Sequence, residues 1–231
     1  AALVVVVPAA VVPAAVGNLL VFSNIFQYLL NMNKEFDQQY LSRVDPILAR
    51  VISTQKITRP KKVDNFFLDL LETIIGQQLS VKAARSITNR FFELFVDKKE
   101  ITPEKILQLD KEILRSKGIS YQKINYLQSL STHILESKLK LDQLDKLSDE
   151  EVKKELIQVK GIGEWTAEMF LIFSLARPDI FSLGDLGLRT AISKLYGVDR
   201  EDKDQIIKIS QTWSPHRSIA SLYLWSSLDN S

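Results

Sequence analysis

Two glycines two residues apart, in the run Lys160-Gly161-Ile162-Gly163, separate two segments with helical patterning. Glycine adopts backbone conformations closed to other residues and lets a second molecule approach the main chain. When a helix begins directly after such a turn, its unpaired N–H groups and the positive end of its dipole can bind a phosphate group. The same pattern is also typical of a plain tight turn, so the residues alone leave both interpretations open.

The carboxylate of Asp185 follows this hairpin after a helix and a loop. A carboxylate can stabilise a positive charge that develops beside it, and it can orient or deprotonate a water molecule. Asp185 also directly precedes the apolar segment that begins at Leu186, where an aspartate is an ordinary N-cap. Its position by itself favours the cap, and the two roles are compatible.

The composition of the chain limits the chemistry that it can perform. Of its 231 residues, 45% are hydrophobic and 25% are charged, which suits one globular unit or two small lobes. The net charge of +2 neither supports nor excludes nucleic acid, because a local basic patch would suffice. The sequence contains no cysteine, which excludes disulfides, thiolate zinc sites, cysteine nucleophiles and cysteine-bound iron–sulfur clusters. The two histidines, His133 and His216, are far apart in the sequence and argue against a histidine-rich metal site.

Residues 1–31 form an apolar leader, and no charged residue precedes Lys34. A secretory signal would begin with a positively charged region, and a membrane span would not favour Pro8 and Pro13 so close together. We therefore expect neither, and we interpret Met32 as the natural start, with the leader as foreign or upstream sequence. The alternative is an apolar arm packed on the body of the protein.

The rest of the chain shows the helical spacing of apolar residues, punctuated by capping residues and glycines. It contains no convincing alternating strand or repeat, and the one β-like run, 4–7, lies in the leader. The sequence therefore predicts an all-α fold. Helices are predicted after Asp64, after Ser80 with Val81 in an apolar stripe, at 103–109 after Thr102, at 111–118, at Tyr121–Leu135, after the capping box 148–151, at 166–175, at Leu186–Tyr196 before Gly197, at 202–213 and at 215–228.

The run Val159-Lys160-Gly161-Ile162-Gly163-Glu164-Trp165-Thr166-Ala167 resembles the helix-hairpin-helix of the base-excision DNA glycosylase superfamily. Asp185 stands where that superfamily keeps its catalytic aspartate. The resemblance covers roughly residues 44–225, and its further motifs occur in the same order. They are a DNA-wedging loop at 74–80, an interhelical turn at 117–123, and at 213–220 a helix start similar to that of the alkylation-repair branch, the 3-methyladenine DNA glycosylase II type.

The resemblance implies two helical lobes that flank a DNA-binding cleft. Residues 67–180 would form the central lobe, which carries the hairpin. Residues 32–66 and 181–231 would together form the second lobe, and Asp185 would lie in the cleft as the catalytic residue.

The resemblance also implies a pocket for a base that has left the DNA stack. Trp165 and Trp225 match pocket tryptophans of the alkylation-repair branch, and core packing is the alternative for each of them. Met169 and Leu186 stand where relatives can have pocket tyrosines, so the shape and selectivity of the pocket stay open.

The remaining implied contacts are with the DNA duplex. Gln78, or its neighbour Leu79, would fill the gap left by the extruded base, and Gln77 would contact the backbone nearby. A polar interhelical turn is the alternative for these residues. The phosphate-binding residues would be those of the hairpin, namely Lys160, Gly161, Ile162 and Gly163, with Arg189 and Arg217 as weaker candidates.

Trp165 stands where the glycosylase/lyases of this superfamily place a Schiff-base lysine, so the imine route to strand nicking is closed. The resemblance therefore implies a monofunctional glycosylase for alkylated purines such as 3-methyladenine and 7-methylguanine. It further implies a monomer in the cytoplasm, associated with the nucleoid, that acts on damaged duplex DNA and has no membrane partner. No cofactor is expected beyond a monovalent cation at the hairpin carbonyls. The alternatives are another lesion specificity, a non-catalytic helix-hairpin-helix DNA-binding protein, or a helical scaffold protein.

Overall fold

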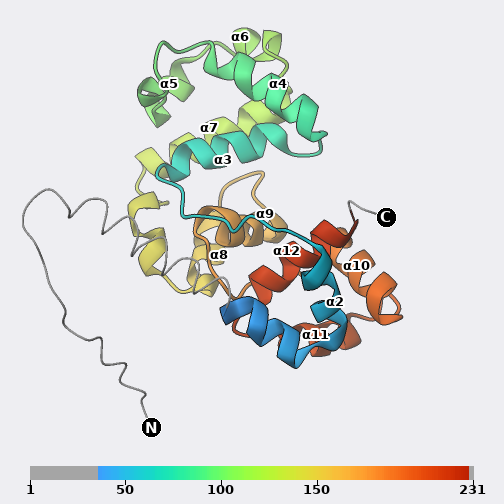
Figure 1. The fold of residues 1–231 in the computed structure, drawn as a ribbon. Helices are drawn as coiled ribbons and strands as arrows, with labels where there is room; N and C mark the ends of the chain where they lie inside the picture. Colours follow the sequence, from blue (N-terminus) through green and yellow to red (C-terminus); the bar gives the residue numbers. More distant parts are fainter. Residues whose placement is uncertain (1–35, 229–231) are drawn as a thin grey trace, which may run out of the picture.

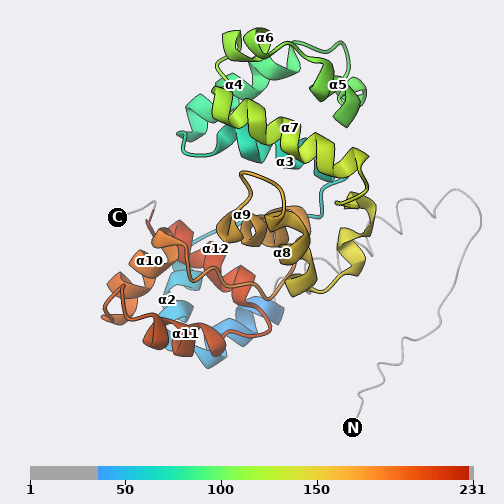
Figure 2. The same ribbon diagram turned by 180° about the vertical axis from the view of Figure 1, so that it is seen from behind.

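The computed structural model describes residues 36–228, and these residues form helices and turns without a β-strand. The predicted all-α fold is confirmed. The leader 1–31, its run 4–7 and the proposed start at Met32 lie outside the described residues. The described helices gather in two groups, and α8 and α9 are the part of the first group that lies nearest the second, as both views of the ribbon show (Figures 1 and 2).

The first group of helices has a continuous apolar core. Its buried side chains run from Phe67 to Ile180, and Ile74, Leu127 and Leu156 are completely excluded from solvent. Burial of each such side chain contributes about 1.5–3 kcal/mol. Helix α7 packs against α3, α5 and α6, and α8 packs against α9. The helices are α3 (Phe66–Gly76), α4 (Val81–Phe92), α5 (Pro103–Gln108), α6 (Lys111–Ser116), α7 (Tyr121–Leu135), α8 (Asp149–Ile157) and α9 (Glu164–Met169).

The second group combines segments from both ends of the described chain. Its core surrounds Trp213 and Tyr223, which are both fully buried. Asp45 caps α2 through Oδ1, while its Oδ2 accepts hydrogen bonds from the Tyr196 hydroxyl at 2.6 Å and from Trp213 Nε1 at 2.7 Å. The helical residues 36–44 are joined by α2 (Pro46–Thr54), α10 (Leu186–Tyr196), α11 (Lys203–Gln211) and α12 (Arg217–Leu228).

The start of α12 is fixed to the segment that leaves the first core. The Arg217 guanidinium binds the Asp179 carboxylate through two nitrogens, at 2.8 and 3.0 Å. The Ser218 hydroxyl accepts a hydrogen bond from Ile180 N at 2.9 Å. Farther along α12, Trp225 packs against both cores. Helix α12 therefore positions its side chains against both groups of helices.

Several predicted helix boundaries agree with the structure. Ser80, Thr102 and Ser148 are N-caps, and Ser148 forms the predicted capping box with Glu151. Two helices, α7 and α10, have the predicted bounds, and Gly197 ends α10 in a left-handed conformation with φ 70°. These features agree because they depend on hydrogen bonds between residues close in sequence.

Other predicted boundaries were wrong. Asn65, not Asp64, caps α3, because its side chain accepts the hydrogen bond from Leu68 N. Val81 is 87% exposed rather than part of an apolar stripe, since the buried residues of α4 begin at Thr88. The helix predicted at 202–213 is shorter at both ends and is α11, Lys203–Gln211. The helix predicted at 215–228 begins later and is α12, Arg217–Leu228.

The helix predicted at 166–175 begins earlier and changes its form. Helix α9 starts at Glu164 and gives way after Met169 to a π-helical turn, Phe170–Ser174. The turn is closed by a hydrogen bond from Leu175 N to Phe170 O. Ser174 O accepts a hydrogen bond from Val63 N, in the segment between α2 and α3, which gives this widened turn a tertiary partner.

Candidate active site

Asp185 is the N-cap of α10 and lies at a half-exposed position. Its Oδ1 accepts a hydrogen bond from Leu188 N at 2.7 Å. The backbone N–H of Asp185 donates to the Ser182 carbonyl at 3.1 Å. The helix start thus fixes the carboxylate in place, and the predicted capping role is confirmed. The cap uses Oδ1 and leaves Oδ2 available for another partner.

Two tryptophans complete the surroundings of this carboxylate. Trp165 Nε1, from α9, donates to Asp185 Oδ2 at 2.8 Å. Trp225 Nε1, from α12, donates to Asp185 Oδ1 at 2.9 Å. Hydrogen bonds to an ionised carboxylate are shorter and stronger than those between neutral groups. The structure therefore brings these three predicted residues together, and it adds indole-to-carboxylate bonds that the sequence patterns do not indicate.

Aromatic and aliphatic side chains remain exposed beside the carboxylate. Trp165 is 46% exposed and Leu186 is 55% exposed. Phe173 is 42% exposed, and its ring stacks on Trp225 with 5.8 Å between centroids and 27° between planes. Exposed aromatic faces can stack with a planar ring, most favourably with a cationic one. Met169, also predicted for the pocket, is half-buried and packs against the core of the first group of helices.

Phe173 and Gly187 belong to this site although the sequence patterns do not single them out. The π-helical turn places Phe173 on the surface, within the segment 166–175 that was predicted as a helix. A Cβ on Gly187 would lie 3.0 Å from Asp185 Oδ1 and 3.3 Å from the Trp225 ring. Glycine at 187 therefore permits the contact between Asp185 and Trp225. A glycine inside a helical pattern was the available signal for it.

The hairpin between α8 and α9 contains two glycines with different surroundings. Gly161 has φ +94°, and a Cβ there would lie 2.2 Å from the Tyr126 ring. Gly163 is the N-cap of α9, with φ −97° and no side-chain cap, and a Cβ on it would have no heavy atom within 4 Å. Ile162 is buried, whereas Lys160 is exposed. The protein's own packing thus requires glycine at 161 but leaves open space at 163.

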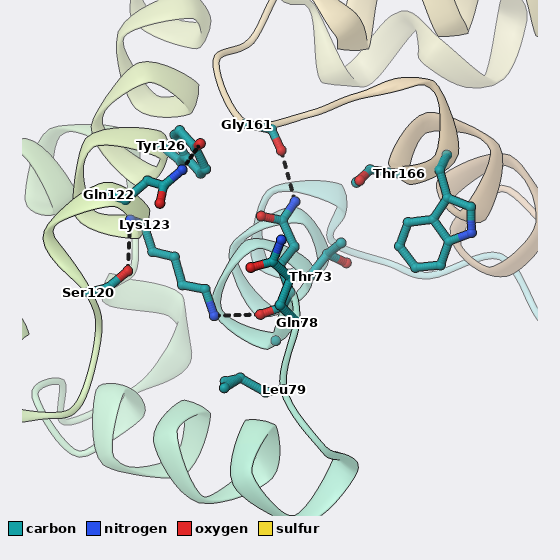
Figure 3. A pocket seen from close by; sticks show the side chains of 12 residues that line it. Thr73, Gln78, Leu79, Ser120, Gln122, Lys123, Tyr126, Gly161 and Thr166 are labelled. Carbon is teal, nitrogen blue, oxygen red and sulfur yellow. Dashed lines mark hydrogen bonds between the residues drawn. The ribbon is translucent and has the colours of Figure 1, made fainter. Parts of the chain in front are cut away.

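The predicted wedge residues occupy the turn between α3 and α4. Gln78 and Leu79 are exposed, whereas Gln77 is half-buried. Gln78 has φ 58°, a left-handed conformation that costs a non-glycine residue about 1–3 kcal/mol. Gln77 Nε2 donates to the Gly161 carbonyl at 2.8 Å, so this turn contacts the hairpin directly. Residues of this turn, of the hairpin and of α7 line one cavity of about 770 Å³ (Figure 3).

The two arginines predicted as weaker phosphate ligands are engaged within the protein. Arg189 Nη1 lies 2.7 Å from Glu201 Oε2. Arg217 is bound to Asp179, as described above. These pairs give Arg189 and Arg217 structural partners, which leaves Lys160 as the exposed basic side chain among the three predicted phosphate ligands.

Within residues 36–228, no group of three or more histidine, aspartate and glutamate side chains is placed to hold a metal ion. Among the carbonyls of the hairpin, that of Val159 accepts from Ile162 N and that of Gly161 accepts from Gln77 Nε2.

Among the residues that the structure describes, no helix has the length and apolarity needed to cross a membrane.

Comparison with known proteins places the site in a family context. A family model described as HhH-GPD superfamily base excision DNA repair protein matches residues 71–216, which include the wedge turn, the hairpin and Asp185. A putative DNA-3-methyladenine glycosylase of Bacillus subtilis is 38% identical over 166 residues, covering 69% of this chain and 58% of that relative. The chain thus spans little more than half the length of this relative.

Two solved structures have a similar fold. The DNA-3-methyladenine glycosidase of Bacillus halodurans superposes with a TM-score of 0.73 and 34% identity, over 83% of this chain and 88% of that one. The 3-methyladenine DNA glycosylase of Schizosaccharomyces pombe, solved in complex with abasic-DNA, superposes with a TM-score of 0.72 and 32% identity, over 84% of this chain and 96% of that one.

Proposed function

The chain belongs to the HhH-GPD superfamily of base excision DNA repair proteins, and from this premise we propose that it is a monofunctional DNA glycosylase. Its substrates would be alkylated purines of the 3-methyladenine and 7-methylguanine type. The observation that carries the proposal is the Asp185 carboxylate, held by indole N–H groups of Trp165 and Trp225 beside exposed aromatic faces. The names of the relatives described above support the same lesion class.

In the proposed mechanism, Asp185 stabilises the positive charge that develops on the deoxyribose as the N-glycosidic bond breaks. The same carboxylate can orient or deprotonate the attacking water. Alkylated purines are cationic, so they leave readily and stack well on electron-rich rings such as those of Trp165 and Trp225. Because Trp165 offers no amine, the chain forms no imine at this position, and the product is an abasic site.

The proposed partner is duplex DNA, which a single copy of the chain would bind in the cytoplasm, in association with the nucleoid. The open space at Gly163 lets a phosphate approach the start of α9, and Lys160 stands exposed beside it. Gln78 and Leu79 would fill the gap left by the extruded base. The complex of the S. pombe relative with abasic-DNA supports DNA as the partner.

A monovalent cation at the hairpin carbonyls stays a prediction. The carbonyls of Lys160 and Ile162 would be the candidate ligands, since those of Val159 and Gly161 accept hydrogen bonds from within the protein. A bound cation would add positive charge where a phosphate approaches.

The direct test is incubation of the protein with methylated DNA, followed by alkali to cleave any abasic sites. Wild-type protein should release methylated purines, whereas Asp185→Asn should release none. Because the asparagine amide oxygen can still accept from Leu188 N and Trp225 Nε1, this variant should keep its fold, and only the exposed Trp165 indole loses its acceptor. Base release by Asp185→Asn at the wild-type rate would remove Asp185 from the mechanism. Binding of methylated DNA without base release by the wild type would identify a non-catalytic DNA-binding protein instead.

A further inference from the structure

Lys123, near the start of α7, is bound to the carboxyl end of α3. Its Nζ donates to the Ile75 carbonyl and to the Gln77 carbonyl, each at 2.7 Å. Figure 3 shows the second of these bonds. The last carbonyls of a helix have no partner within it and carry partial negative charge, so an ammonium group stabilises them. Lys123 is half-buried in this position, and burial lowers the pKa of its ammonium group.

The contact of Lys123 bears directly on the exposed tip of the wedge turn. The Gln77 carbonyl belongs to the peptide unit that joins Gln77 to Gln78, so Lys123 fixes the orientation of that unit. The next backbone torsion is the φ of Gln78, whose value of 58° is rarely adopted by a residue other than glycine. A left-handed residue persists where its surroundings determine its conformation, and Lys123 provides part of those surroundings.

The side chain of Gln77 connects the same turn to the hairpin. Its Nε2 donates to the carbonyl of Gly161, which itself packs on the Tyr126 ring of α7. The wedge turn, the hairpin and α7 thus contact one another around a single cavity, which all three segments line. A movement of the hairpin toward a phosphate would carry the wedge turn with it.

We infer that Lys123 and Gln77 are positioning residues that hold the wedge turn in its left-handed form and join it to the hairpin as one rigid unit. This inference rests on the proposed function, because it explains how Gln78 is presented to the DNA stack. Docking of the hairpin on the backbone then places Gln78 at the gap without a separate ordering step. Neither positioning residue touches the reacting atoms.

An alternative role for Lys123 is direct contact with a DNA phosphate. Its ammonium group is already bound to two protein carbonyls, at 2.7 Å each, which favours the positioning role. The two roles predict different dependence on the state of the target base. A phosphate contact would serve every duplex equally, whereas a positioned wedge matters most where the base is still stacked and paired.

The experiment compares Lys123→Met with wild type on two duplexes that carry one 7-methylguanine. In the first the lesion is opposite cytosine, and in the second it is opposite an abasic-site analogue, so that it is already unpaired. We expect kcat/KM of Lys123→Met to fall about tenfold on the first duplex and only about twofold on the second. Lys123→Arg, which can still donate to two carbonyls, should recover most of the loss. Lys105→Met, an exposed position on α5, is the control for loss of a positive charge.

A second variant keeps the test decisive if Lys123→Met fails to fold, as its melting temperature would reveal. Gln77→Met removes the donor to Gly161 at similar side-chain length and should show the same dependence on pairing. Because the two residues act on one turn, the double variant should lose less than the product of the single losses. Two outcomes would overturn the inference. One is an equal loss of kcat/KM on both duplexes, and the other is a wild-type kcat/KM for both Gln77→Met and Lys123→Met on the duplex with the paired lesion.

A readout without catalysis separates this inference from the proposed function. In a duplex with an abasic-site analogue, 2-aminopurine beside the gap changes its fluorescence when a side chain enters the stack. We expect this change with the wild type and a loss of most of it with both variants. If the wild type releases no base but still produces the change, the proposed activity fails and the positioning role stands. An unchanged signal in both variants would refute the positioning role.

Discussion

At the scale of single residues, the carboxylate of Asp185 receives three N–H groups from three parts of the chain. The donor from Leu188 belongs to its own helix, and the indole donors come from α9 and α12. Both oxygens are held, so the carboxylate cannot rotate freely about its Cβ–Cγ bond. Catalysis depends on such fixed geometry, because small displacements of a charged group weaken its stabilisation of the transition state.

Trp225→Phe tests this orientation. Phenylalanine keeps an aromatic ring against Phe173 and the two cores but removes the donor to Asp185 Oδ1. We expect the single-turnover rate of base release to fall about tenfold, as for a loss of about 1.4 kcal/mol from the transition state, while the smaller ring lowers the melting temperature modestly. Trp165→Phe should have a comparable effect through Oδ2. If both variants release base at the wild-type rate, the indole donors have no role in orientation.

Glu168, on α9, provides a second test, and its carboxylate accepts a hydrogen bond from the Ser182 hydroxyl at 2.5 Å. Burial raises the pKa of its carboxyl group, against a hydrogen bond from Ser182. A folded-state pKa above the unfolded value of about 4.3 means that folding favours the protonated form. This contribution to stability is present below the unfolded pKa and is lost as the pH rises through the folded pKa.

Glu168→Gln, which mimics the protonated form, should therefore have a higher melting temperature than wild type at neutral pH. The difference in melting temperature should shrink as the pH falls below the pKa of an ordinary glutamate, because the wild-type carboxyl group is then protonated in both states. Melting curves across this pH range provide the measurement. A difference that grows toward acid would contradict the raised pKa.

At the scale of elements, the two glycines of the hairpin should respond differently to substitution, because Gly161 is packed against Tyr126 and Gly163 faces open space. Gly163→Ala meets no neighbouring atom and needs no left-handed φ, so it should keep the wild-type melting temperature. Its methyl group would occupy the space that a phosphate needs, and we expect DNA affinity to fall about tenfold. Gly161→Ala is the matched variant, and its clash with Tyr126 should lower the melting temperature. Undiminished DNA binding by Gly163→Ala would contradict a phosphate contact at this helix start.

At the scale of the whole molecule, Asp45 joins the two ends of the described chain. It caps α2 and accepts hydrogen bonds from Tyr196 and Trp213, which belong to the C-terminal part of the fold. Asp45→Ala removes the cap and leaves two polar groups without this partner, one of them the buried Trp213 indole. The free energy of unfolding should decrease by roughly 2–4 kcal/mol, measured by urea denaturation. Asp64→Ala, at an exposed position that caps no helix, is the control and should change it little.

The sequence by itself determined most helices, several caps and the family. The N-caps at Ser80 and Ser148 and the extents of α7 and α10 follow from spacing and hydrogen bonds within a few residues. Such features are encoded locally and need no tertiary partner to be recognised. The succession of motifs from the wedge turn through the hairpin to Asp185 was likewise sufficient to identify the superfamily.

Only the tertiary structure decided how the side chains of the site meet. Trp165 and Trp225 lie on helices far apart in sequence, and their convergence on Asp185 depends on how the two groups of helices pack. The exposure of Phe173 depends on a π-helical turn with a partner in the segment after α2. The contacts of Lys123 and Gln77 likewise cross between segments. Periodicity along the chain specifies which face of a helix is buried, but not which distant residue it will contact.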